Sequence, residues 1–353
     1  MKKKTPKPLR RFLSLLLAAA ISVTAQAMPV TAETAEIAEI TEIPETTETE
    51  EIVKTAEVEE IAEATEEISG ILETAETTEI TETAETAEIS ETTETEETAE
   101  TNTMQPLSIA GGSPANPVHH CTKQDDGSDT TDWSYVYFGS YPQTEVTGDA
   151  LTPAITGAPY DGNGDAWVDG VKYRRISKSD TNNSSYFGNA QYRYFKWERI
   201  KWRVLRNDGS TLFLAADKGL DCKDYNETYA SITWENCTLR SWLNKEFYGT
   251  AFSSSEQAAI VAQDVVNEDN PDYNTEGGND TRDKVYLLSI GEVTNPEYGF
   301  CEDYSTYSAS RRVQASDYAH ARGASTDSGS YEGNSWWWLR SSGGFTSIAA
   351  DVS

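Results

Sequence analysis

The sequence predicts an α+β fold for the second half of this chain, with an antiparallel sheet and two short helices. Apolar and polar residues alternate over Tyr135–Tyr141 and Arg199–Leu205, which is typical of half-buried strands. Apolar residues between Leu239 and Phe247 are instead spaced as on one face of a helix. All nine tryptophans and all 18 tyrosines lie in residues 128–353, which we predict to be one globular domain.

The N-terminus has the pattern of a secretory signal peptide over residues 1–27. Six basic residues in Met1–Arg11 precede the apolar run Phe12–Val23, and Ala25-Gln26-Ala27 is a small-residue cleavage site. We expect cleavage after Ala27, with Ala32 as the alternative. No other segment is apolar enough to span a membrane, so we expect a secreted, extracellular protein, either free or associated with the cell surface.

Residues 28–104 form a threonine- and glutamate-rich tract with a three-residue repeat. The tract holds 25 glutamates and one lysine, so it carries most of the formal charge of −31. Like charges this dense, without aromatic residues, predict a disordered, extended stalk in preference to a helical rod. The acidity also argues against a nucleic-acid partner. Residues 105–127 are expected to be a linker.

Within the domain, local signals place the strands and helices in order. In Arg199–Leu205, Ile200, Trp202 and Val204 share one face, and the turn at residues 207–209 leads into a second strand over residues 211–215. After the helix that ends near Phe247, the pattern Ser253-x-x-Glu256 is a capping box that opens a second helix. Residues 285–289 are expected to form a buried strand, and residues 294–334 are expected to be mostly loop.

Seven motifs of this domain resemble a bacterial family of secreted proteins, domain of unknown function 6273. They occur in the family's order: FGSYPQ, IKWRVL, LFLAADKGLD, TWENCTLRSWLN, FYGTAFSSSEQAAI, DKVYLLSIGEV and WWWLRSSGG. The resemblance implies no established activity. The layout is also similar to C-type-lectin-like and formylglycine-generating-enzyme-like domains, which implies a fold but no function. Family members continue past the last motif to a closing strand, so we expect this sequence to be truncated at its C-terminus.

Two clusters combine tryptophan with arginine, and we interpret them as the structural signature of the domain. Their arginines sit among apolar side chains, which favours packing and hydrogen bonds to carbonyls or a carboxylate such as Glu235 over a ligand-binding role. The signature residues are Trp234, Arg240, Trp242, Trp337, Trp338 and Arg340.

The predicted ligand-binding surface is the loop between these clusters, because tyrosine, serine, glycine and arginine are typical of adaptable recognition loops. An exposed linker is the alternative. The candidate residues are Tyr298, Tyr304, Tyr307, Arg311, Arg312, Tyr318 and Tyr331.

Calcium is the one cofactor that the residues suggest. Asp161, Asn163, Asp165 and Asp169 occupy positions 1, 3, 5 and 9 of a calcium-loop pattern. Position 6 lacks its glycine and position 12 lacks its glutamate, so a plain turn is the favoured interpretation.

Four cysteines in an exported chain allow disulfides. Pairing of Cys222 with Cys237 would close a local loop, and pairing of Cys121 with Cys301 would tie the entry of the domain to the long loop. Buried free thiols are the alternative.

Signals for catalysis are weak. His320 is the only histidine inside the domain, and no nucleophile elbow, phosphate loop or zinc-protease motif is present. The favoured function is therefore a surface-exposed, non-catalytic binding module for a glycan or an extracellular protein. The alternative is an extracellular hydrolase acting on carbohydrate or cell wall through paired carboxylates, with these candidates: Glu198, Glu235, Glu246 and Glu292.

Overall fold

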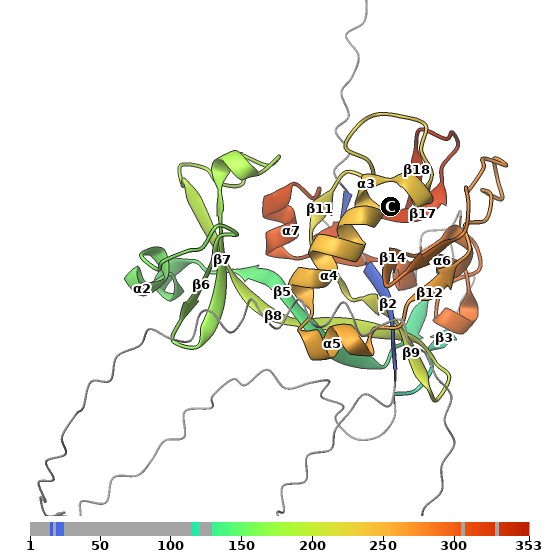
Figure 1. The fold of residues 1–353 in the computed structure, drawn as a ribbon, viewed down its shortest axis with the longest axis horizontal. Coiled ribbons are helices and arrows are strands. Elements are labelled where there is room, and N and C mark those ends of the chain that lie inside the picture. Colours follow the sequence, from blue (N-terminus) through green and yellow to red (C-terminus); the bar gives the residue numbers. More distant parts are fainter. Residues whose placement is uncertain are drawn as a thin grey trace, which may run out of the picture. The chain divides into compact units, whose positions relative to one another are not determined.

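The computed structural model describes residues 15–16, 19–24, 114–120, 129–304, 308–328 and 332–352, which belong to one compact unit (Figure 1). The predicted stalk lies outside the described residues. The unit is strand-rich with short helices, so the predicted α+β class is confirmed. Among the described residues no helix is both long and apolar enough to cross a membrane.

The main sheet is antiparallel throughout and is organised by one long strand, β8. Each end of β8 pairs with a different neighbour along one side, β7 at its start and β9 at its end, while β5 runs along the other side. The alternation predicted for residues 199–205 is confirmed, because Ile200, Trp202 and Val204 are all buried. The sheet order is β14 (Val285–Leu287), β2 (Ala19–Thr24), β9 (Thr211–Ala216), β8 (Tyr192–Asn207), β7 (Val171–Ser177) and β6 (Asp165–Val168), with β5 (Tyr135–Glu145) on β8.

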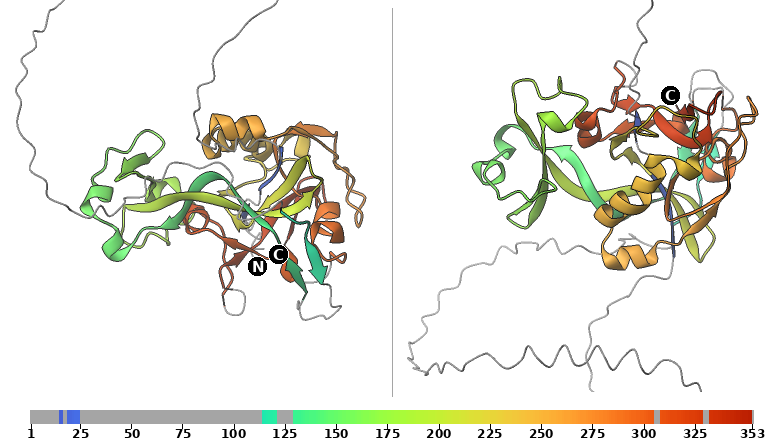
Figure 2. Two further views of the ribbon diagram at one scale, coloured as in Figure 1. Left: turned by 90° about the horizontal axis from the view of Figure 1, so that it is seen from below. Right: turned by 45° about the horizontal axis from the view of Figure 1, so that its top comes forward.

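Strand β8 extends beyond the core and carries a small lobe at its N-terminal end. Strands β6 and β7 and the short helix α2 (Pro153–Thr156) form this lobe, which projects to one side of the larger body (Figures 1 and 2). The larger body holds the remaining helices and strands. The two lobes therefore share a strand and are not separate domains.

The N-terminal apolar segment is part of the main sheet. Strand β2 lies between β9 and β14, and its residues from Ala19 to Val23 are buried. Just before it, β1 (Leu15–Leu16) pairs with β11 (Cys222–Lys223) and β17 (Trp337–Ser342). The compact unit thus includes residues that precede the domain start expected at residue 128.

Smaller ladders complete the body. One sheet has the order β11, β1, β17 and β18 (Ala349–Val352), in which β17 holds the WWLRSS segment. The remaining ladders are β10 (Lys218–Gly219) with β15 (Val313–Ala315) and β16 (Asn334–Ser335), β12 (Gln263–Val265) with β13 (Thr281–Asp283), and β3 (Val118–His120) with β4 (Thr130–Asp132).

Both predicted helices are present. The first is α3 (Thr238–Trp242), which runs through a π-helical turn, η4 (Leu243–Phe247), into α4 (Tyr248–Ala251). The second is α5 (Ser254–Ala259), with the predicted capping box of Ser253 and Glu256. Short 3-10 turns occur at Gly148–Ala150, Lys178–Asp180, Trp234–Asn236 (η3), Pro296–Tyr298 (η5) and Ala309–Arg311 (η6).

The prediction that residues 294–334 are mostly loop is confirmed for their described part, but the segment also contains regular elements that the sequence did not reveal. Helix α7 (Asp317–Arg322), strands β15 and β16, and two 3-10 turns lie there, and α6 (Ile290–Val293) directly precedes them. Ser316 caps α7 by accepting from the backbone N–H of Ala319, and Ala319 and Ala321 are buried. Because alanine is the only aliphatic residue on this helix, its apolar face is faint in the sequence.

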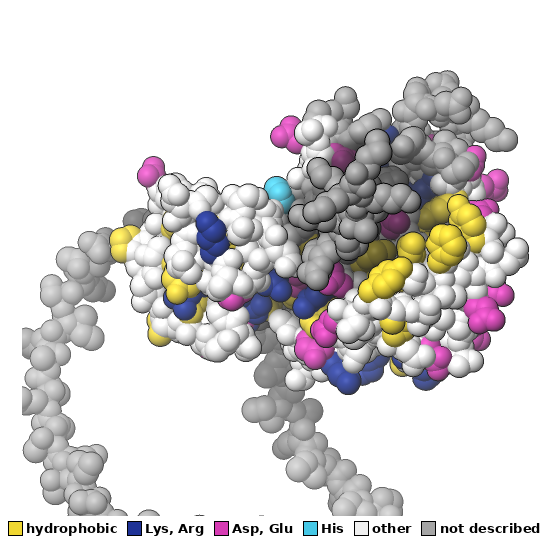
Figure 3. Space-filling model, turned by 90° about the horizontal axis from the view of Figure 1, so that it is seen from above, with side chains coloured by type: hydrophobic (Ala, Val, Ile, Leu, Met, Phe, Trp, Pro, Cys, Tyr) yellow, Lys and Arg dark blue, Asp and Glu magenta, His cyan; other side chains and the backbone are white. Residues whose placement is uncertain are grey.

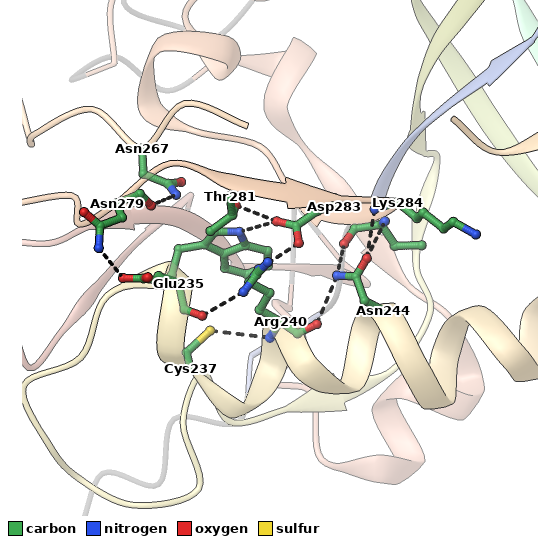
Figure 4. A network of polar contacts seen from close by, with 11 residues as sticks. Glu235, Cys237, Arg240, Asn244, Asn267, Asn279, Thr281, Asp283 and Lys284 are labelled. Atoms are coloured by element: carbon green, nitrogen blue, oxygen red, sulfur yellow. Dashed lines mark hydrogen bonds and ion pairs between the residues drawn. The ribbon is translucent and has the colours of Figure 1, made fainter. Parts of the chain in front are cut away.

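One buried carboxylate joins helix α3 to the neighbouring strands (Figure 4). Asp283 accepts hydrogen bonds from Trp234 Nε1 at 3.0 Å, Arg240 Nε at 2.7 Å and Thr281 Oγ1 at 2.7 Å. One turn further along, the Asn244 side chain accepts from Val285 N at 3.2 Å and donates to Val285 O at 2.8 Å. Side chains of the helix thus continue the hydrogen bonding of strand β14.

We expect Asp283→Ala to lower the free energy of unfolding by about 3 kcal/mol, because it removes the carboxylate partner of the half-buried Arg240 and leaves the buried Trp234 indole N–H without its acceptor. Urea denaturation followed by tryptophan fluorescence measures the change. The control is Asp264→Ala, which removes the solvent-exposed ion pair with Arg282 and should cost less than about 1 kcal/mol. Equal losses in both variants would contradict the assignment of Asp283 as a structural hub.

Candidate functional site

The arginines of the predicted ligand loop are part of the interior. Arg311 is only 3% exposed and donates to the backbone carbonyls of Val293 at 3.2 Å, Cys301 at 2.9 Å and Asp303 at 2.8 Å. Burial lowers the pKa of its guanidinium. Arg312 is half-buried, and its carbonyl accepts from Arg203. These contacts stabilise the path of the chain and leave Arg311 inaccessible to a ligand.

The described tyrosines of that loop also face inward. Tyr318 is buried against Tyr141 and Phe195, with ring centroids 5.8 and 5.3 Å away. The Tyr304 hydroxyl donates to the Asp351 carbonyl at 2.6 Å, and Tyr298 packs edge-on against Phe213. Tyr307 and Tyr331 lie outside the described residues. Of the described candidates, Tyr298 and Tyr318 line cavities, but neither projects into solvent.

The second tryptophan–arginine cluster has the geometry of a scaffold. Arg340 is buried, donates to the carbonyls of Leu287 at 2.9 Å and Val266 at 3.1 Å, and forms an ion pair with Glu292. Its guanidinium lies 5.8 Å from the centroid of the Tyr286 ring.

The tryptophans of both clusters are likewise packed. The buried indoles of Trp337 and Trp338 donate to the carbonyls of Arg311 and Lys223, each at 3.1 Å. Trp242 is half-buried and contacts the ring of Phe247. For Arg240, the predicted acceptor Glu235 contributes its backbone carbonyl, at 2.8 Å, while the carboxylate partner is Asp283.

The candidate calcium residues form a turn whose carboxylates already have partners. Asp161 accepts from the backbone N–H groups of Asn163 at 2.8 Å and Asp165 at 2.9 Å, which lowers its pKa. Asp165 is buried and pairs with Arg174 and with Lys172. Asp169 turns the chain between β6 and β7 with a φ of 50°. No group of three or more potential metal ligands occurs in the described part of the chain.

The predicted disulfide between Cys222 and Cys237 is absent, because Cys237 carries a free thiol. Its sulfur instead accepts from the backbone N–H of Arg240 at 3.4 Å and caps helix α3. Cys222 and Cys301 are buried. Cys121 lies outside the described residues, and the predicted pairing of Cys121 with Cys301 stays a prediction.

The candidate catalytic residues lie on separate elements. Glu198, on β8, lines a cavity of about 320 Å³ and accepts from Thr144, whereas Glu292 lines another of about 460 Å³ and is engaged by Arg340. Glu235 accepts from Asn279 at 3.0 Å, and Glu246 is exposed on η4. His320 packs edge-on against Tyr186. Glu198 and Glu292 thus line different cavities, and each already has a hydrogen-bond or ion-pair partner.

The structure instead gathers exposed apolar side chains at the turn between β17 and β18. We call these four residues the turn patch: Tyr229, Tyr273, Phe345 and Ile348, which are 88%, 66%, 71% and 49% exposed. Tyr229 reaches the turn through its hydroxyl, 3.1 Å from Ser347 Oγ, and Tyr273 packs beside Gly344. Figure 3 shows hydrophobic side chains gathered on one face of the larger body. Contiguous exposed apolar surface of this kind is typical of interaction sites.

Hydrogen bonds from two separate segments hold the turn in place. Asn270 Nδ2 donates to the Ser342 carbonyl at 2.7 Å, and Ser342 Oγ donates to the Glu276 carbonyl at 2.8 Å. On the other side, Ile232 N donates to the Thr346 carbonyl at 2.9 Å. The patch therefore rests on an ordered support, so a partner would not have to order it on binding.

Acidic residues flank the patch on the loop that carries Tyr273. Asp269, Asp272 and Glu276 are exposed there. None of these three carboxylates has a cation within ion-pairing distance among the described residues. The site thus combines an apolar centre with a negative rim.

Sequence reasoning missed this site because its residues come from three segments more than 40 positions apart. The one local signal was the apolar pair Phe345 and Ile348 in a turn that begins with Gly343 and Gly344, since turn residues are usually polar.

Residues 208–353 match the model of a family described as a domain of unknown function, DUF6273. The match starts at the turn between β8 and β9 and covers both tryptophan–arginine clusters and the turn patch. Searches of curated proteins and of solved structures gave no match.

The Cys237 thiol yields a direct test of the corrected cysteine assignment. Burial raises its pKa to about 11, so almost no thiolate forms at pH 8 and alkylation should be slow in the folded protein. We expect iodoacetamide to modify Cys237 at pH 8 only after unfolding in guanidinium, as measured by peptide mass spectrometry. Reactivity in the folded state should rise only as the pH approaches 11. A Cys222–Cys237 cross-linked peptide in a non-reduced digest would contradict the assignment.

Proposed function

We propose that this protein is an exported, non-catalytic binding module that contacts an extracellular protein through the turn patch. The observation that carries the proposal is the exposure of Tyr229, Tyr273 and Phe345 around one hydrogen-bonded turn. Aromatic residues supply most of the binding energy at protein interfaces, and they lose little conformational freedom when they bind.

The chemistry of the patch favours a protein partner over a glycan. Ile348 adds a purely aliphatic surface beside the aromatic rings, and the patch lies on a turn rather than in a cavity. The acidic rim of Asp269, Asp272 and Glu276 favours a partner with basic residues around an apolar centre, because complementary charge speeds association and selects the partner.

The location and fold class of the module are also proposals. The leader pattern over residues 1–27 supports export, and the acidic tract supports display of the domain away from its attachment point. The antiparallel sheet with a tryptophan-rich late strand supports a C-type-lectin-like fold, a class that includes many surface binders. Glu198 and Glu292 line different cavities, which favours binding over hydrolysis by that pair.

The test is an array of extracellular and cell-surface proteins, with a glycan array and a hydrolysis assay run in parallel, using the full chain. We expect protein binding that Phe345→Ser weakens at least about tenfold, as for a central interface residue. The matched control is Trp167→Ser, which removes another exposed aromatic residue, from β6 in the small lobe, and should leave binding unchanged.

The dependence of binding on ionic strength and the two parallel assays distinguish protein binding through the turn patch from the other possible functions. We expect the protein-binding affinity to fall as ionic strength rises, because the acidic rim interacts with basic residues through screened charges. Binding confined to glycans, or equal binding by the wild type and Phe345→Ser, would reject the patch. Turnover that is lost on substitution of a single glutamate would establish the hydrolase instead.

A further inference from the structure

The position of strand β2 raises the question of what completes the main sheet. Ala20, Ile21, Ser22, Val23 and Thr24 pair with residues 215 to 211 of β9, and residues 19–21 pair with β14 on the other side. Without β2, two strands would each present an open edge, and the apolar interior between them would be exposed. Open edges of this kind bind further strands.

The slot between β9 and β14 has a defined shape. Ala20 lies opposite Ala215, and Ile21 lies between Leu214 and Val285, where it is fully buried. Ser22 is the one polar side chain in the buried stretch, and it hydrogen-bonds the Tyr286 hydroxyl. The slot therefore accepts an extended, uncharged segment with a small residue at its second position.

Contacts outside the ladder fix the register of the occupant. The backbone N–H of Val261 donates to the Ser22 carbonyl at 2.8 Å, and Val23 forms an isolated antiparallel bridge with Ile260. Both partners lie at the C-terminal end of helix α5. A slip by one residue would place Ser22 and Thr24 where Ile21 and Val23 are buried, so the register is strongly specified.

The occupant is distant in sequence from the strands on either side of it. Strands β9 and β14 begin at Thr211 and Val285, so β2 reaches them across a long stretch of chain and not through a hairpin. Non-local pairing of this kind costs loop-closure entropy before its contacts are gained. The segment therefore reaches the slot as a separate strand and not as one arm of a hairpin.

From these observations we propose that the slot between β9 and β14 is a strand-acceptor site, and that its occupant is the chain's own strand β2, Ala19–Thr24. This segment stays bound in the folded domain even when the chain is cut after Ala27. The residues with the pattern of an export leader thus have a second role as an inner strand of the fold.

Hydrogen exchange on the intact full chain tests whether the slot is filled. We expect the amides of residues 20–24 to exchange at least about a thousandfold more slowly than in an unfolded peptide, and at rates similar to those of β9. Exchange of these amides at the rate of an unfolded peptide would overturn the proposal. The experiment uses the unsubstituted chain, so misfolding of a variant cannot affect the result.

Cutting the folded chain tests whether the segment is held without a covalent link. A site-specific protease sequence inserted after Glu60 allows cleavage after folding, followed by size-exclusion chromatography and mass spectrometry. We expect the N-terminal fragment to stay with the domain. Release of that fragment from the otherwise unsubstituted chain would overturn the proposal.

A pair of matched substitutions in the same cut chain tests the specificity of the slot. Ile21→Asp places a charge where Ile21 is fully buried, so the fragment should be released and the thermal midpoint of the domain should fall. Ile37→Asp makes the same chemical change within the acidic tract and should alter neither result. Retention of the Ile21→Asp fragment would show nonspecific adhesion and overturn the proposal.

Discussion

Burial of charged groups that bond to segments distant in sequence is the constraint on which this fold depends. Asp283 and Arg340 are both nearly inaccessible, and each accepts or donates several hydrogen bonds to segments distant in sequence. An unpaired charge at either position would cost several kcal/mol. Helix α3, strand β13 and strand β17 are therefore placed relative to one another by polar contacts as well as by apolar packing.

Much of the larger body follows from local patterns in the sequence. Alternation in residues 199–205 and the capping box at Ser253 act over a few residues, so one sequence is enough to find them. The partner of Arg240 could not be found in this way, because Asp283 is 43 positions away and many carboxylates compete for it. The burial of Arg311 could not be predicted for a similar reason. A buried, hydrogen-bonded arginine and an exposed arginine occur in similar local sequences.

The N-terminal segment shows a different limit of sequence reasoning. An apolar stretch with alanine, isoleucine and valine satisfies the requirements of an export leader and of an inner β-strand equally well. Only its pairing with β9 and β14 distinguishes the two. The turn patch was missed because exposure is a property of the folded surface, and neither Tyr229 nor Tyr273 differs in its local sequence from a buried tyrosine.

Strand β8 also determines how the protein can unfold. Its 16 residues belong to both lobes, so the small lobe has no boundary at which the chain could be divided without breaking a ladder. The two lobes should therefore melt in a single transition. A force applied to the small lobe would reach the core along the continuous backbone of β8.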